Sequence, residues 1–159
     1  MLNFAIIGCG RIAKRHSELL GDNQITGAQL VAVCDNVSKK SEKIGNQIGV
    51  SAYTDMNAMM QKEKVDVVVV LTPSGLHAEH VVNLSQYGKD IMVEKPMALT
   101  LDSADAMIEA CDRNSCRLFI IKQNRFNVPV VKLREAYQVG RFGKLVLGTV
   151  RVRWARHQA

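Results

Sequence analysis

The chain has 159 residues, of which 47% are hydrophobic and 23% charged; it is long enough for one globular domain with a sizeable core and part of another. Its net charge of +6 arises in residues 117–159, where ten Lys/Arg accompany one acid, and this indicates either an anionic ligand or a missing acidic partner surface. The absence of a signal pattern, a long apolar run, metal-type cysteine spacing and a nucleic-acid motif predicts a cytoplasmic protein with no metal, membrane or nucleic-acid partner.

The first predicted strand is followed at once by a glycine turn and a helix. Apolar residues 4–7 precede the turn, and a helix is expected over 11–20. The turn carries the G-x-G-x-x-A pattern, as Gly8-Cys9-Gly10-Arg11-Ile12-Ala13. Gly8 permits the tight turn, Gly10 lets the backbone approach a pyrophosphate, and Ala13 lets the helix pack on the sheet. The pyrophosphate of a dinucleotide would then lie at the helix N-terminus.

The second predicted strand, 30–34, ends at an acid. Asp35 comes 25 residues after Gly10. A carboxylate there accepts hydrogen bonds from the adenosine ribose and repels a 2′-phosphate, so the sequence predicts NAD rather than NADP. Lys39 and Lys40 lie nearby and weaken that discrimination. The alternative is that the glycines serve the turn alone.

Strand-like and helix-like segments continue to alternate as far as residue 121. Helices are expected over 38–48, 56–61, 76–86 and 102–115, and strands over 50–53, 65–71, 90–93 and 117–121. Six strands with intervening helices predict the α/β class, as a Rossmann-type doubly wound parallel sheet. Polar segments follow several strands and should gather at the carboxyl ends of those strands, where such sheets bind ligands.

The pattern changes after residue 122. A helix is expected over 128–139, and alternating apolar residues predict a long strand over 144–154. Because a lone strand has no partner for its backbone groups, we expect 123–159 to begin a truncated α+β substrate or oligomerisation domain, after an NAD domain at 1–122. The apolar face of that strand favours a homo-oligomer, whereas repulsion among its basic residues favours a disordered tail.

Four motifs together resemble the Gfo/Idh/MocA family of oxidoreductases. They are the glycine turn, Cys34-Asp35, Thr72-Pro73-Ser74-Gly75-Leu76-His77 and Glu94-Lys95-Pro96. Residues 122–127 and 143–148 are also similar to the WbpB/WlbA/BplA-type enzymes of lipopolysaccharide O-antigen biosynthesis. The resemblance implies NAD-dependent oxidation of a UDP-N-acetyl-hexosaminuronic acid at C3, with this chain an incomplete form. The alternatives are another sugar or polyol dehydrogenase of the family, such as an inositol-type enzyme, and a non-catalytic dinucleotide-binding fragment.

The resemblance also implies roles for single residues. Lys95 would be catalytic, contacting the reacting hydroxyl and the nicotinamide ribose. Asn124 and Arg125 would join Lys95 in binding substrate, and a guanidinium suits a carboxylate or phosphate. Cofactor contacts would come from Gly8, Gly10, Arg11, Ile12, Asp35, Asn36, Thr72, Pro73, His77, Glu94, Lys95 and Gln123.

Some of these residues have a second interpretation. Lys95 and Arg125 are of types common on surfaces, and His77 suits a helix N-terminus without a catalytic task. The family's histidine general base, with an aspartate upstream of it, has no match here, because His157 lies outside any such motif. We therefore expect a chain that binds NAD yet lacks parts needed for turnover.

Overall fold

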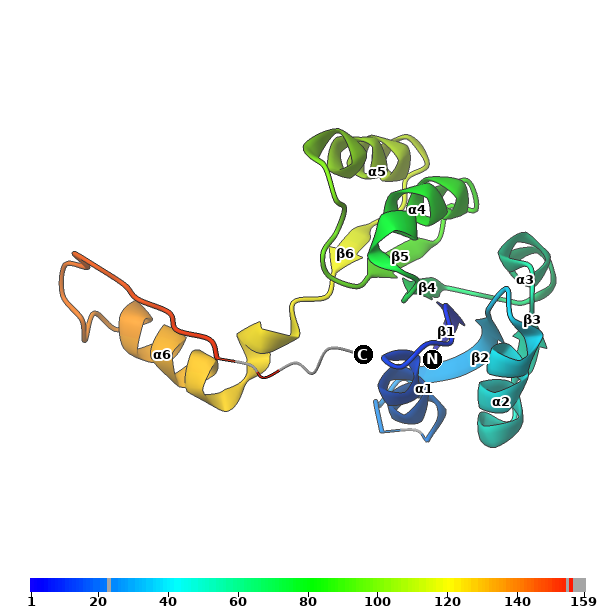
Figure 1. Cartoon of the computed structure of the whole chain (residues 1–159), viewed down its shortest axis with the longest axis horizontal. Coiled ribbons are helices and arrows are strands. Elements are labelled where there is room, and N and C mark those ends of the chain that lie inside the picture. Colours follow the sequence, from blue (N-terminus) through cyan, green and yellow to red (C-terminus); the bar gives the residue numbers. More distant parts are fainter. Residues whose placement is uncertain (23, 154, 156–159) are drawn as a thin grey trace. The chain divides into compact units, whose positions relative to one another are not determined.

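Strands and helices alternate from the N-terminus to residue 122 in the computed structural model, which describes residues 1–22, 24–153 and 155 (Figure 1). The strands are β1 (Leu2–Ile7), β2 (Ala28–Cys34), β3 (Ser51–Tyr53), β4 (Val67–Val70), β5 (Asp90–Val93) and β6 (Leu118–Ile120). The helices are α1 (Ala13–Gly21), α2 (Ser38–Ile48), α3 (Met56–Lys62), α4 (His77–Ser85) and α5 (Leu101–Arg113), with the 3-10 turn η1 (Ser74–Leu76) before α4. Residues 1–122 form one unit of the structure, and a second unit begins at Gln123.

The six strands form one parallel sheet in the order β3-β2-β1-β4-β5-β6. This order confirms the predicted doubly wound sheet, and it reverses direction between β1 and β4. The register aligns the last residues of the central strands, since Ile7 pairs with both Cys34 and Val70, and Val70 pairs with Val93. The loops after these strands therefore leave the sheet at one edge, called here the carboxyl edge.

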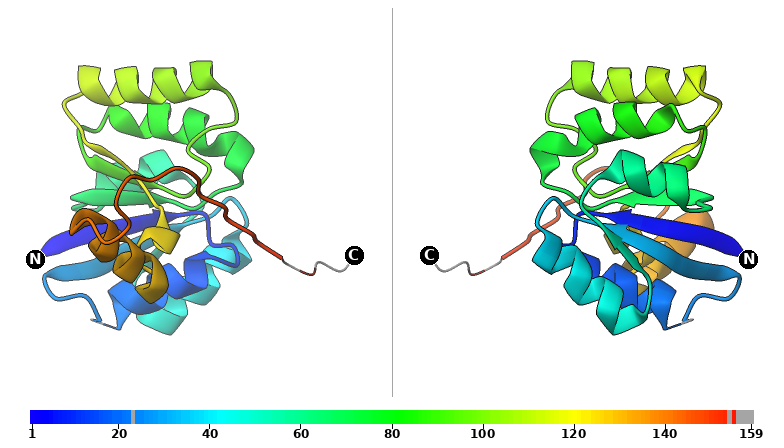
Figure 2. Two further views of the ribbon diagram at one scale, coloured as in Figure 1. Left: turned by 90° about the vertical axis from the view of Figure 1, so that its left-hand side faces the viewer. Right: turned by 90° about the vertical axis from the view of Figure 1, so that its right-hand side faces the viewer.

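Two hydrophobic cores lie on opposite faces of the sheet. Ala5 and Ile7 of β1 face the core shared with α3, α4 and α5, whereas Ile6 between them faces the core shared with α1 and α2. Figure 2 shows helices on both sides of the sheet. All four valines of β4 are buried, as expected for a central parallel strand covered on both faces. Among the described residues, no helix combines the length and apolar character that a membrane span requires.

The second unit differs from its prediction in one element. After the short 3-10 helix η2 (Gln123–Phe126), α6 (Val128–Gln138) confirms the expected helix. The expected strand over 144–154 is wrong for residues 144–153, which have no regular structure. Trp154 and His157 lie outside the described residues. Alternation indicates only that a segment could be a strand, and within the described residues no strand lies beside this one to accept its backbone hydrogen bonds. Self-association stays a prediction, but residues 144–153 do not form the strand from which it was argued.

The two glycines of the first turn differ in the space around them. Gly8 has φ +92°, and a Cβ there would lie 2.8 Å from backbone atoms of Leu71 and Thr72. A Cβ at Gly10 would meet no atom within 4 Å, and the φ of Gly10 lies outside the left-handed region.

Gly8→Ala should therefore lower the free energy of unfolding by about 1–3 kcal/mol, because it adds backbone strain and a clash between β1 and β4. Gly10→Ala is the matched control and should change it by less than about 1 kcal/mol. Urea unfolding of both variants measures the difference. Equal stability of Gly8→Ala and the parent chain would contradict the close approach.

Candidate functional site

Four loops of the carboxyl edge are joined to the neighbouring strands by backbone hydrogen bonds. Gly8 N–H donates to Cys34 O over 2.8 Å, and Leu71 N–H donates to Ile7 O over 2.7 Å. Glu94 N–H donates to Val70 O over 3.0 Å. The backbone hydrogen bonds of the sheet thus continue for one residue beyond each of these strands. The residues predicted to bind ligands begin where these hydrogen bonds end.

The glycine turn leads into α1 and leaves its N-terminus accessible. Ala13, the first residue of α1, is fully buried, so the helix packs closely on the sheet. Gly10, Arg11 and Ile12 are exposed. The first turn of α1 has no acidic side chain that would repel an anion, while the N–H groups of Ala13 and Arg15 already donate to Gly10 O and Ile12 O over 3.1 and 3.2 Å. Together with the open space at Gly10, these features fit the pyrophosphate of a dinucleotide.

The Asp35 carboxylate connects the end of β2 to the glycine turn. Its Oδ2 accepts a hydrogen bond from Cys9 N–H at 2.8 Å, and its Oδ1 accepts one from Val37 N–H at 2.9 Å. The residue is 9% exposed, beside exposed Asn36. A carboxylate oxygen can accept more than one hydrogen bond, so both oxygens keep capacity for ribose hydroxyls. The sequence did not indicate the bond to Cys9, because no spacing rule pairs a turn amide with this acid.

Two thiols lie beneath this carboxylate. Burial raises the pKa of Cys9 to about 12, and the charge of Asp35 acts in the same direction. Burial also raises the pKa of Cys34 to about 11, with Asp55 and Asp35 adding to the effect. Both side chains are buried and therefore stay neutral near neutral pH.

Glu94 links the loop after β5 to α1. It is 8% exposed, and its Oε2 accepts a hydrogen bond from Lys95 N–H at 2.9 Å. His16 Nε2 of α1 lies 3.6 Å from Glu94 Oε1. The Lys95 side chain is exposed, and the Lys95–Pro96 peptide bond is cis. No motif marks His16, which faces this loop only because α1 packs beside β1.

His77 lies between the loop after β4 and the loop after β5. Its ring is 1% exposed, with Nδ1 2.8 Å from Pro96 O and Nε2 2.8 Å from Thr72 O. One turn later in α4, His80 Nδ1 lies 3.0 Å from Thr72 Oγ1, and burial lowers the pKa of His80. Pro73 is exposed in the same loop. The ring of His77 is thus enclosed by the protein, and its contact with a cofactor stays a prediction.

The predicted site residues fall into the two units of the structure. The carboxyl edge brings together those of the first unit, which are Gly8, Gly10, Arg11, Ile12, Asp35, Asn36, Thr72, Pro73, His77, Glu94 and Lys95. Gln123, Asn124 and Arg125 form most of η2 in the second unit, where Asn127 Nδ2 donates to Asn124 Oδ1 over 3.3 Å. The ligand contacts of all these residues stay predictions.

Residues 2–122 match the model of an oxidoreductase family with an NAD-binding Rossmann fold, Gfo/Idh/MocA. The chain is 33% identical to D-apiose dehydrogenase of Paraburkholderia graminis over 95% of its own length, and 29% identical to inositol 2-dehydrogenase of Rhizobium meliloti over 94%. It also resembles the crystal structure of the WlbA dehydrogenase of Bordetella pertussis in complex with NADH and UDP-GlcNAcA, with a TM-score of 0.84, 33% identity and 89% of this chain covered.

These proteins are longer than the chain. It spans 40% of the D-apiose dehydrogenase, 44% of the inositol dehydrogenase and 43% of the WlbA chain. The similarity therefore concerns less than half of each relative. What those whole proteins do comes to this chain only as a proposal.

The raised thiol pKa values predict that Cys9 and Cys34 resist alkylation. At pH 8.5 an ordinary thiol is about half ionised, whereas these two should remain almost wholly protonated in the folded chain. Iodoacetamide followed by mass spectrometry should label them slowly in the native chain and fast in urea. In the unfolded chain these thiols have ordinary pKa values and ionise at a lower pH than in the folded chain. The free energy of unfolding should therefore also fall as the pH rises above about 8.5. Rapid labelling of Cys9 in the folded chain would contradict the burial of the Cys9 side chain.

Proposed function

The chain belongs to the Gfo/Idh/MocA family of oxidoreductases, and we propose that it binds NAD and takes part in NAD-dependent oxidation of a sugar-type alcohol. One observation carries the proposal. The glycine turn, the Asp35 carboxylate and Lys95 follow β1, β2 and β5 at the carboxyl edge, on either side of the point where the strand order reverses, and doubly wound sheets bind dinucleotides at such a point.

The cofactor half of the proposal rests on the glycine turn and β2. The pyrophosphate would take the open space at Gly10 at the N-terminus of α1, with exposed Arg11 and Ile12 beside it. Asp35 and Asn36 would receive the adenosine ribose, and the negative charge of Asp35 would disfavour a 2′-phosphate.

The catalytic half rests on Lys95. Bound NAD supplies the acceptor for the hydride that leaves the alcohol carbon, and a protein group must accept the hydroxyl proton. The Lys95 side chain is exposed at the carboxyl edge, while its backbone N–H donates to buried Glu94. In its neutral amine form, Lys95 Nζ would contact the hydroxyl and accept its proton as the hydride leaves the alcohol carbon. Thr72, Pro73, His77, Glu94 and Gln123 would border the nicotinamide side of the cofactor.

For the substrate, we propose a UDP-N-acetyl-hexosaminuronic acid oxidised at C3, in cytoplasmic lipopolysaccharide biosynthesis. Support comes from the similarity to the WlbA dehydrogenase and from Arg125, whose guanidinium suits a carboxylate or phosphate. Asn124 would bind beside it. A second candidate, a simple sugar or polyol, is supported by the D-apiose and inositol dehydrogenases. Turnover with NAD and a panel of UDP-sugar acids, pentoses and inositols distinguishes them. Reduction of NAD by inositol alone would favour the second candidate.

Asp35→Ala should weaken NAD binding by about tenfold or more and bring the dissociation constants of NAD and NADP closer together, because the variant loses both the ribose acceptor and the repulsion of a 2′-phosphate. Calorimetric titration measures both constants. Asp66→Ala is the matched control, since the Asp66 carboxylate also accepts a backbone N–H, from Asn3, at the opposite edge of the sheet. Tighter binding of NADP than NAD by the parent chain would overturn the role of Asp35.

In the longer protein of which this chain is expected to be an incomplete form, Lys95→Ala should lower kcat by about 10²–10⁴-fold, more than it changes KM, because it removes a proton-transfer group. Lys89→Ala is the control, since Lys89 precedes β5 whereas Lys95 comes after it. Initial rates of NADH formation report both constants. Activity of Lys95→Ala within a few-fold of the parent would exclude the proposed role.

A further inference from the structure

We propose that His77 donates a hydrogen bond from each ring nitrogen, joins the loop after β4 to the loop after β5, and is thereby a positioning residue for Lys95. This arrangement is called here the His77 bridge. It rests on the proposed function, because positioning Lys95 matters only if Lys95 takes part in the reaction.

The partners of the ring decide where its protons are. Both Thr72 O and Pro96 O are backbone carbonyl oxygens, which can only accept, and each lies 2.8 Å from a ring nitrogen. A neutral imidazole has one N–H and one lone pair, so one of the two contacts would place a lone pair against an oxygen. Only a ring with a proton on both nitrogens satisfies both contacts.

Burial makes this requirement strict. The ring is 1% exposed, so water cannot replace a missing partner. His80 contacts the Thr72 side chain rather than its carbonyl.

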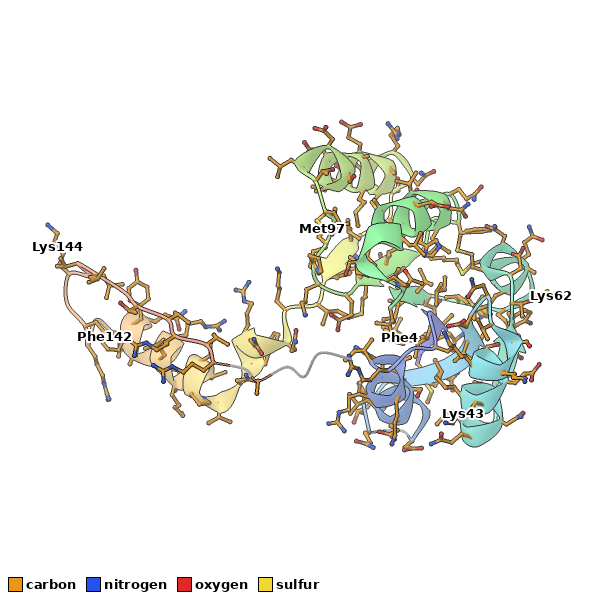
Figure 3. The ribbon with its side chains drawn as sticks, in the orientation of Figure 1. Phe4, Lys43, Lys62, Met97, Phe142 and Lys144 are labelled. Carbon is orange, nitrogen blue, oxygen red and sulfur yellow. The ribbon has the colours of Figure 1, made fainter. Side chains whose placement is uncertain are left out.

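The bridge acts on the residue next to Lys95. Pro96 has no N–H, so its carbonyl oxygen is the only backbone group of this residue that can hold the loop by a hydrogen bond. N-terminal to Lys95, the loop is held by the Glu94 carboxylate, which accepts the Lys95 N–H. C-terminal to it, Met97 packs against the core shared with α3, α4 and α5 (labelled in Figure 3). Lys95 is thus fixed from both sides, while its side chain stays exposed at the carboxyl edge.

The proton count can be measured without any ligand. In a ¹⁵N-labelled sample, imidazole-selective NMR should show two ring N–H signals that both disappear in His77→Gln. His80 serves as the internal comparison, because burial lowers its pKa and its ring should show at most one N–H near neutral pH. A single N–H signal from His77 would overturn the two-donor bridge.

A second measurement tests positioning. His77→Leu should speed amide hydrogen exchange by about tenfold or more in residues 72–76 and 94–98, with smaller changes elsewhere in the sheet. Ser85→Ala is the matched control, because Ser85 is buried at the other end of α4 and bonds Val82 O and Asn114. Unchanged exchange in the two loops, or acceleration spread equally over the sheet, would overturn the proposal.

Activity separates this inference from the proposed function. In the same longer protein, His77→Leu should lower kcat by about tenfold or more, a larger change than in KM, as expected for a misplaced proton-transfer group. Full activity of His77→Leu beside an inactive Lys95→Ala would overturn the bridge and leave the proposed function intact. Full activity of Lys95→Ala would overturn the proposed function and the positioning role together, whatever the NMR shows.

Discussion

The close approach of two backbones at Gly8 is the constraint on which the site depends. With φ +92° and no Cβ, Gly8 brings the end of β1 to within contact of the Leu71–Thr72 peptide after β4. These two strands are neighbours at the reversal of strand order, where the first and second halves of the sheet meet. A side chain at this position would push apart the glycine turn and the Thr72 loop. These two segments are proposed to bind the pyrophosphate and the nicotinamide side of the cofactor.

Three buried polar side chains hold the remaining loops of the carboxyl edge. Asp35 accepts from Cys9 N–H, Glu94 accepts from Lys95 N–H, and His77 lies between two carbonyl groups. Because each of them is buried, water competes poorly for these hydrogen bonds, and the loops are fixed before any ligand arrives. The same residues were predicted as ligand contacts. Substitution of these residues therefore changes loop geometry as well as any ligand contact, which is why the Asp35 and His77 variants are paired with controls away from the carboxyl edge, Asp66 and Ser85.

The relatives share a fold and differ in what their names say they act on. The family match ends at residue 122, with the unit that carries the sheet, whereas two of the three residues proposed to bind substrate, Asn124 and Arg125, lie in the second unit. A fold supports many reactions when the groups that contact substrate lie on separate segments. The choice between a UDP-sugar acid and a simple polyol is therefore a question about η2 and the residues C-terminal to it rather than about the sheet.

Periodicity and turn chemistry within the chain were sufficient to predict the parallel sheet. Every strand of the sheet except the short β3 corresponds to a local apolar run, and the valines of β4 indicated burial on both faces. Gly8, Gly10 and Asp35 were identifiable because their conformational and charge requirements are local to one turn. Strand ends were predicted less closely, and the helix expected over 76–86 is α4 (His77–Ser85), preceded by the 3-10 turn η1 (Ser74–Leu76).

Contacts between segments distant along the chain depended on how the helices pack on the sheet. His16 reaches Glu94 across 78 residues of sequence, and His77 reaches Pro96 from another helix, with no motif that links either pair. The segment 144–153 shows the same limit on prediction from sequence. Its apolar and polar residues alternate as in a strand, but a strand forms only where a neighbouring strand accepts its backbone hydrogen bonds. Local patterns in the amino-acid sequence set the elements and the types of group at their ends. Packing set which of those groups meet, because that depends on distances between elements that no spacing along the chain records.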